Sequence, residues 1–137
     1  PAGVLLADRL KMPFAYVRAK PKEHGRQNLI EGSISQDAKV LVIEDLISTG
    51  MSSLQAVEAI RQVPAQVGGV LAIFQYGMPK ATEAFEKAGC PFYTLTDFKT
   101  IIQVAAEKHI IEHDHLELLG SWSADPQAWS ENYLRTH

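Results

Sequence analysis

Short apolar runs alternate along the sequence with longer segments in which apolar residues recur at helical spacing. The runs at 39–44, 69–76 and 92–95 predict buried strands. The helical segments are residues 3–11, 49–62, 79–88 and 98–109, the last of them capped by Asp97. Strands separated by helices of about ten residues indicate βαβ units. We therefore predict an α/β fold of Rossmann-like type, with a mainly parallel β-sheet flanked by helices.

The two ends of the chain carry further elements of a single expected domain, residues 1–137. Residues 14–18 read as a strand, which a polar stretch at 19–28 separates from a short extended piece at 29–32. The tail, from about 112 to 137, reads as one or two helices, with Trp122 and Trp129 as expected packing anchors.

The most informative segment is the one at residues 40–53. Four apolar residues, three of them β-branched, lead directly into the adjacent carboxylates Glu44 and Asp45. A short polar loop with one glycine, Gly50, then precedes the next helix. Backbone N–H groups at a helix start can bind phosphate, together with loop hydroxyls, here those of Ser48, Thr49, Ser52 and Ser53. The acids suit sugar hydroxyls, Mg²⁺ or a developing positive charge beside that phosphate.

This segment resembles the phosphoribosyl pyrophosphate (PRPP) signature of type I phosphoribosyltransferases. That signature consists of four apolar residues, Glu or Asp, Asp, two variable residues, Ser or Thr, a small residue and Gly. An ordinary strand–loop–helix unit, with Ser48 or Thr49 merely capping the helix, is the alternative, but it leaves the paired acids unexplained. The Walker phosphate loop lacks its Gly-Lys-Ser/Thr here, and the dinucleotide fingerprint lacks its glycines.

A second resemblance narrows the family. Basic residues alternate along 18–26, so that in an extended chain they share one side; they are Arg18, Lys20, Lys22, His24 and Arg26. Arg18, Lys22, His24 and Gly25 match the catalytic loop of orotate phosphoribosyltransferase, which has the form Arg-x-x-x-Lys-x-His-Gly. A solvated charged loop is the alternative for such a run. On these motifs the chain is identified as similar to orotate phosphoribosyltransferases.

The resemblance implies transfer of the ribosyl 5-phosphate group from PRPP to orotate, giving orotidine 5′-monophosphate and pyrophosphate, in pyrimidine biosynthesis. It implies Lys22, His24 and Asp45 as catalytic residues. We also expect Ser48 to contact orotate, because backbone N–H groups near it could meet the orotate carboxylate. The residues expected to bind PRPP are Arg18, Lys22, His24, Glu44, Asp45, Leu46, Ile47, Ser48, Thr49, Gly50, Met51 and Ser52. The cofactor Mg²⁺ would be held mainly by PRPP. A homodimer is expected, with the 18–28 loop shared across the interface.

The sequence departs from the family pattern at a few positions. Ala19 stands where many members have a second Lys, Met51 where Gly or Thr is common, and residues 75–78 contain no Arg to contact orotate. The chain also begins in a helix that, by resemblance, follows a pyrophosphate loop, so we expect an N-terminal portion to be missing. The open alternatives are a phosphoribosyltransferase for another base, a PRPP-binding regulator, or an inactive PRPP-binding fragment.

The amino-acid composition limits the classes of protein to which the chain can belong. A chain of 137 residues with 46% hydrophobic content can bury one core, and a net charge of −3 argues against nucleic acid as a partner. The one cysteine, Cys90, fits a reducing compartment, and no apolar run or signal peptide points to a membrane. We therefore expect a cytoplasmic protein. The His-x-His at 113–115 matches no metal-ligand spacing.

Overall fold

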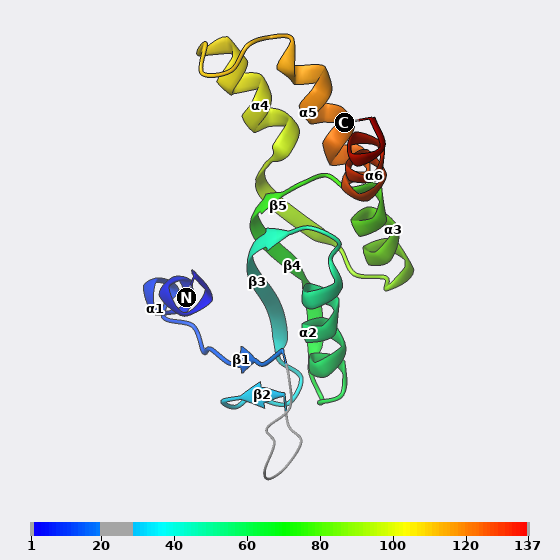
Figure 1. Ribbon diagram of the computed structural model, residues 1–137. Helices are drawn as coiled ribbons and strands as arrows, with labels where there is room; N and C mark the ends of the chain where they lie inside the picture. The colour runs from blue at the N-terminus through cyan, green and yellow to red at the C-terminus, as the bar shows by residue number, and fades with distance from the viewer. Residues whose placement is uncertain (1, 20–28, 137) are drawn as a thin grey trace.

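The chain builds one parallel sheet with helices around it, as the computed structural model shows for residues 2–19 and 29–136 (Figure 1). The elements in chain order are α1 Ala2–Leu10, β1 Tyr16–Val17, β2 Ile30–Glu31, β3 Lys39–Ile47, α2 Met51–Arg61, β4 Gln66–Gln75, α3 Pro79–Lys87, β5 Phe92–Asp97, α4 Phe98–Glu107, α5 His115–Ala124 and α6 Pro126–Thr136. Every predicted element is present.

The sheet has the order β3–β4–β5, and both of its strand pairs are parallel. Val70 in the central strand pairs with Val42 on one side and Phe92 on the other. The short strands β1 and β2 form a separate antiparallel pair, in which Tyr16 faces Glu31. The predicted α/β architecture with a mainly parallel sheet is therefore confirmed.

The hydrophobic core lies between the sheet and the two helices α2 and α3. Val42 and Val70 from the strands meet Val57 and Ile60 from α2 and Phe85 from α3, and none of the five is more than 8% exposed. The ring of Phe85 also stacks on Phe92, with centroids 4.4 Å apart. Alternate strand residues point to one face, so the β-branched runs read in the sequence supply this core.

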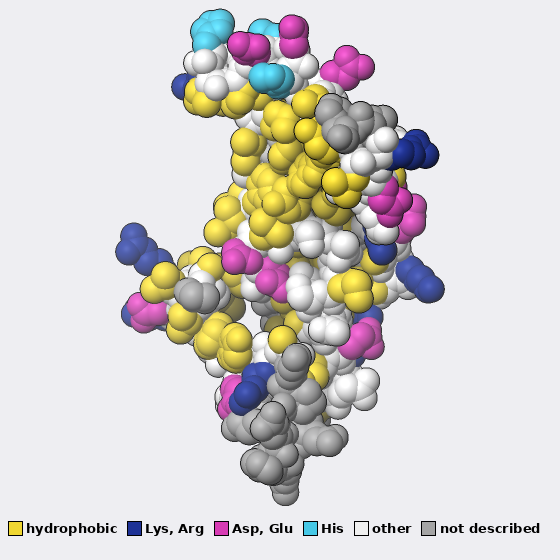
Figure 2. Space-filling model, in the orientation of Figure 1, with side chains coloured by type: hydrophobic (Ala, Val, Ile, Leu, Met, Phe, Trp, Pro, Cys, Tyr) yellow, Lys and Arg dark blue, Asp and Glu magenta, His cyan; other side chains and the backbone are white. Residues whose placement is uncertain are grey.

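The other face of the sheet is largely open. Leu41, Ile73, Tyr93 and Leu95 alternate with the core residues and are 49–75% exposed. Helix α1 lies on this side and contacts β3 (Figure 1). Hydrophobic side chains continue from the sheet onto α4 and α5 (Figure 2). Parallel sheets are usually covered on both faces, so this face is unusually apolar for a solvent surface.

Two boundaries differ from the prediction, and both affect the loop after β3. The strand continues three residues past the predicted end, because Leu46 and Ile47 still pair with Phe74 and Gln75 of β4. Helix α2 starts at Met51 and not at Thr49, because the left-handed backbone of Gly50, with φ 79°, cannot belong to a right-handed helix. The adjacent acids therefore lie within β3 and not beyond its tip.

The C-terminal helices dock through aromatic contacts. Trp122 of α5 packs edge-on against Tyr76, with centroids 5.6 Å apart, and also contacts Phe98 of α4. The predicted cap is present, since the Asp97 carboxylate accepts the Thr100 N–H at 2.8 Å. Trp122 is confirmed as a packing anchor, whereas Trp129 stacks on Tyr133 of its own helix. Among the described residues, no helix is long and apolar enough to span a membrane.

Candidate active site

The carboxyl ends of the parallel strands meet at one edge of the sheet, where open α/β sheets bind their ligands. Two hydrogen bonds tie these strand ends together. The Tyr76 N–H donates to the carbonyl of Ile47 at 3.2 Å, and the Gln75 Nε2 donates to the Thr94 hydroxyl at 2.8 Å. The loop between β3 and α2 emerges at this edge.

We call residues 48–52 the phosphate loop, and its shape depends on Gly50. A Cβ at this position would lie 2.7 Å from Cε2 of Phe85, whose side chain is 1% exposed and cannot move aside. The positive φ of Gly50 also disfavours other residues. The loop therefore turns tightly over the core, and the missing side chain lets the backbone approach Phe85.

Helix α2 begins at the end of this loop without a side-chain cap. Its N-cap is Gly50, so neither Ser48 nor Thr49 caps it, and the alternative in which these residues serve only as caps is wrong. The first helical hydrogen bond runs from the Leu54 N–H to the Gly50 carbonyl at 2.9 Å. The preceding N–H groups of Met51, Ser52 and Ser53 have no partner inside the helix. Together with the helix dipole, these donors favour an anion here.

The two acids that precede the loop have different surroundings. Neighbouring strand residues point to opposite faces, so Glu44 and Asp45 diverge. Glu44 points toward α2, where its Oε1 accepts a hydrogen bond from the Ser53 hydroxyl at 3.1 Å. Burial raises the pKa of Glu44, the Ser53 hydrogen bond partly offsets this, and Asp45 raises it further. Asp45 is exposed, and its carboxylate accepts no hydrogen bond from the described residues.

The other residues of this segment that are predicted to bind PRPP differ in their exposure to solvent. Leu46 and Met51 are exposed, at 40% and 63%, and Ser52 is exposed as well. Ser48 and Thr49 are half-buried. Ile47 is a core residue, 1% exposed, so only its backbone faces the site.

Arg18 does not lie beside the phosphate loop. Its backbone N–H donates to the Leu29 carbonyl at 2.8 Å, and its Nη1 lies 3.1 Å from the Glu31 carboxylate. These residues lie by the β1–β2 pair, near the amino end of β3, whereas the phosphate loop follows the carboxyl end (Figure 1). Lys22 and His24 lie outside the described residues.

Two residues of this site escaped sequence reasoning. Phe85 shapes the phosphate loop from a helix far along the chain, and nothing local to residues 40–53 signals it. Ser53 was placed with the phosphate-binding hydroxyls, yet its side chain is 1% exposed and directed to Glu44. Its position three residues after Gly50, on the same helical face as Val57 and Ile60, was the available signal.

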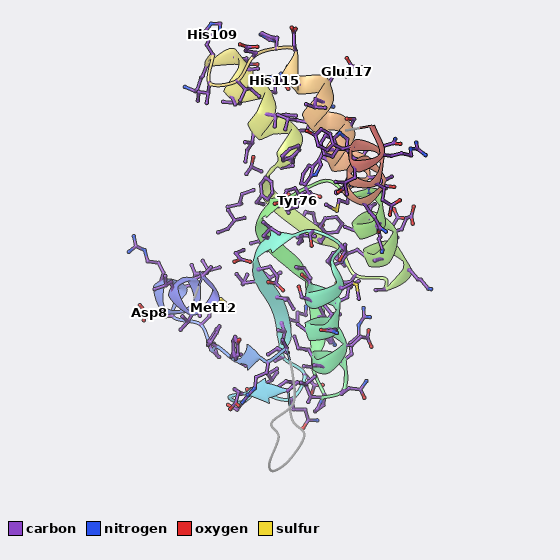
Figure 3. The ribbon with its side chains drawn as sticks, in the orientation of Figure 1. Asp8, Met12, Tyr76, His109, His115 and Glu117 are labelled. Atoms are coloured by element: carbon purple, nitrogen blue, oxygen red, sulfur yellow. The ribbon has the colours of Figure 1, made fainter. Side chains whose placement is uncertain are left out.

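The histidines of the 109–115 turn do not join this site. His109 and His115 lie at the outer end of the α4–α5 pair, away from Tyr76 at the sheet edge (Figure 3). No cluster of metal-ligating side chains occurs within residues 2–19 and 29–136.

The fold matches solved phosphoribosyltransferases. The orotate phosphoribosyltransferase of Aeropyrum pernix superposes with a TM-score of 0.68 and 30% identity, over 75% of this chain and 57% of that one. The adenine phosphoribosyltransferase of Leishmania tarentolae shares the fold at a TM-score of 0.55 and 21% identity, over 70% of this chain and 56% of that one. The protein is thus a type I phosphoribosyltransferase in fold.

The sequence comparison narrows the set of related proteins further than the comparison of folds does. The orotate phosphoribosyltransferase of Cutibacterium acnes is 52% identical over 129 residues, which make up 94% of this chain and 60% of the relative. That of Bacillus subtilis is 48% identical over 93% of this chain and 59% of the relative. No protein-family model matches the chain. The chain is a homologue of the orotate phosphoribosyltransferases and spans about three fifths of their length.

We predict that Gly50→Ala destabilises the fold by about 2–4 kcal/mol, from backbone strain and from overpacking against Phe85. Urea unfolding measures this change. Gly89→Ala is the matched control, because Gly89 also has a positive φ, 57°, but a Cβ there meets nothing within 4 Å. We expect it to cost only about 1 kcal/mol. Equal losses in the two variants would show that contact with Phe85 does not restrain the loop.

We predict that Glu44→Gln stabilises the fold at pH 7. A raised pKa means that the ionised carboxylate is less favourable in the folded than in the unfolded state, so removing its charge helps. The gain stays below about 1 kcal/mol because the group is half-exposed to solvent. It should vanish below about pH 4, where the wild-type carboxyl is neutral in both states.

Urea unfolding at pH 7 and at pH 4 measures this difference, with Glu83→Gln on the exposed face of α3 as the control. A Glu44→Gln variant that is less stable than the wild type at pH 7 would contradict the prediction.

Proposed function

We propose that the chain transfers the ribosyl 5-phosphate group from PRPP to orotate, releasing pyrophosphate and forming orotidine 5′-monophosphate. The observation that carries this proposal is the phosphate loop, with Gly50 against Phe85, an uncapped helix start and two carboxylates directly upstream. The bacterial relatives named orotate phosphoribosyltransferase support the choice of base.

In this proposal the backbone N–H groups of the phosphate loop bind the 5′-phosphate, helped by the Ser48, Thr49 and Ser52 hydroxyls. Glu44 and Asp45, which leave β3 on opposite faces, hold the ribose 2′- and 3′-hydroxyls directly or through water. The bond from C1 to pyrophosphate breaks as the bond from C1 to orotate N1 forms, N1 gives up its proton to water or to the departing pyrophosphate, and positive charge develops on the ribose ring. Glu44 and Asp45 would stabilise that charge, and Arg18, Lys22 and His24 the charge on the departing pyrophosphate.

Mg²⁺ fits the described part of this site, because Glu44, Asp45 and the loop hydroxyls offer the oxygen ligands that this ion prefers. We propose that PRPP oxygens and water hold it, so that the ion enters with the substrate. Its chemistry would be to neutralise the pyrophosphate. We also place the protein in the cytoplasm, in keeping with the buried free thiol of Cys90.

The groups that recognise the base would come from the part of the site next to the phosphate loop. We propose that backbone N–H groups near Ser48 meet the orotate carboxylate. Gln75, at the end of β4, directs its amide to Thr94, and no Arg follows it at 76–78. A base without a carboxylate, such as adenine, is the competing substrate, and PRPP binding without transfer is the competing function.

We further propose a homodimer in which the 18–28 loop of one copy serves the active site of the other. The support is the position of Arg18, which is paired with Glu31 near the amino end of β3. The nine-residue strand β3 is about 26 Å long, so the phosphate loop lies far from the start of the 18–28 loop in the same chain.

We predict PRPP-dependent consumption of orotate by this chain with Mg²⁺, and a fall of about 100-fold in kcat for Asp45→Asn, because the variant loses the charge beside the ribose. An absorbance assay of orotate measures both. Asp8→Asn, on exposed α1, is the control and should act as wild type. Turnover of adenine instead of orotate would replace the proposed base, and PRPP binding without turnover would favour the non-catalytic function.

We predict that mixing Lys22→Ala with Asp45→Asn restores activity. If the 18–28 loop crosses between copies, half of the randomly paired dimers contain one active site that combines a wild-type 18–28 loop with a wild-type Asp45. Turnover should then recover to about a quarter of the wild-type value after subunit exchange. The same measurement on each variant alone gives the baseline. A mixture no more active than its components would assign both residues to one copy.

A further inference from the structure

Ser53 stands apart from the other hydroxyl residues of this segment. It is the buried polar residue of the described core, 1% exposed, and it lies on the face of α2 that also carries Val57 and Ile60. A hydroxyl in an apolar core is costly unless it is hydrogen-bonded. Ser53 meets that requirement by donating to Glu44 Oε1 at 3.1 Å.

The position of Ser53 excludes the two ordinary roles of a hydroxyl at a helix start. It does not cap α2, because the N-cap is Gly50. Nor can its side chain reach a phosphate in the loop, because it is enclosed between α2 and the sheet. What remains is its action on Glu44.

Glu44 needs such a partner if it is to present its carboxylate in one orientation. A glutamate side chain has three rotatable bonds, and fixing them costs conformational entropy. Ser53 engages Oε1, whereas Oε2 accepts no hydrogen bond from the described residues. The free oxygen is therefore available to an incoming hydroxyl group.

We propose that Ser53 is a positioning residue, whose buried hydroxyl fixes the Glu44 carboxylate so that its second oxygen receives a ribose hydroxyl of the bound PRPP. The proposal rests on the proposed function for the identity of the ligand. The action of Ser53 on Glu44 itself does not depend on that function, so the two can be tested separately.

The first test is the titration of Glu44, followed by NMR of its labelled side-chain carboxyl carbon. Removing the donor in Ser53→Ala should move the Glu44 titration midpoint to higher pH, because the hydroxyl favours the ionised form. The charged group that acts on Glu44 from the described elements is Asp45, and it is unchanged in this variant. Ser53→Cys replaces the hydroxyl by a slightly larger group that is only a weak donor, and it should also raise the midpoint. An unchanged midpoint in both variants would overturn the proposal.

The second test is PRPP affinity, measured by calorimetry with Mg²⁺ in four proteins: wild type, Ser53→Ala, Glu44→Ala and the double variant. Ser53→Ala should weaken PRPP binding about three- to tenfold. In the Glu44→Ala background, which removes the acceptor of the Ser53 hydroxyl, it should have no further effect, because Ser53 acts through Glu44. Ser121→Ala, which removes an exposed hydroxyl of α5, is the control.

The outcomes separate the two proposals. Loss of affinity of the same size in both backgrounds would overturn the positioning role, since a purely structural effect would not depend on Glu44. A wild-type chain that binds no PRPP would overturn the proposed function, and the Glu44 titration would then decide alone whether Ser53 acts on this carboxylate.

Discussion

The contact between Gly50 and Phe85 is the constraint on which the site depends. Phe85 is held from α3 and stacked on Phe92 of β5, so its ring is fixed by the core. The phosphate loop can lie over that ring only because Gly50 has no Cβ and adopts a left-handed backbone. This turn sets where α2 begins and therefore which N–H groups are left without helical partners. Core packing and the proposed anion binding thus depend on the same contact.

Near the phosphate loop, the half-buried Glu44 lowers the folding stability at a place where we propose that substrate binds. Glu44 is an acid in a half-buried place, and its raised pKa shows that folding disfavours its charge. An apolar residue facing α2 would pack there at no such cost. The buried Ser53 hydroxyl offsets part of the penalty and has no other partner among the described residues. A carboxylate and its buried donor, retained together inside an otherwise apolar layer, are better explained by ligand binding than by folding.

Much of this architecture was predictable because the relevant signals are local. The β-branched runs and helical periods placed every element. The acids with the following Ser, Thr and Gly predict a phosphate site, and that site stays a prediction. The end of β3 and the start of α2 were missed, because pairing with β4 and contact with Phe85 decide them. The role of Ser53 was missed for a related reason: its spacing from Gly50 could not show which strand residue its hydroxyl would meet. Tertiary contacts, not propensity, fix these details.

The separation of Arg18 from the phosphate loop follows from the same parallel topology. Residues at the start and the end of one strand face opposite edges of the sheet, and β3 puts about 26 Å between them. The Glu31 carboxylate holds Arg18 at the amino edge, beside the β1–β2 pair. A side chain that contacts a substrate at the carboxyl ends of the strands must belong to an element that extends to these ends. Within the described residues, the acids and the phosphate loop lie toward the carboxyl end of β3, whereas Arg18 lies near its amino end, and this separation is the structural reason for the proposed sharing of the 18–28 loop between two copies.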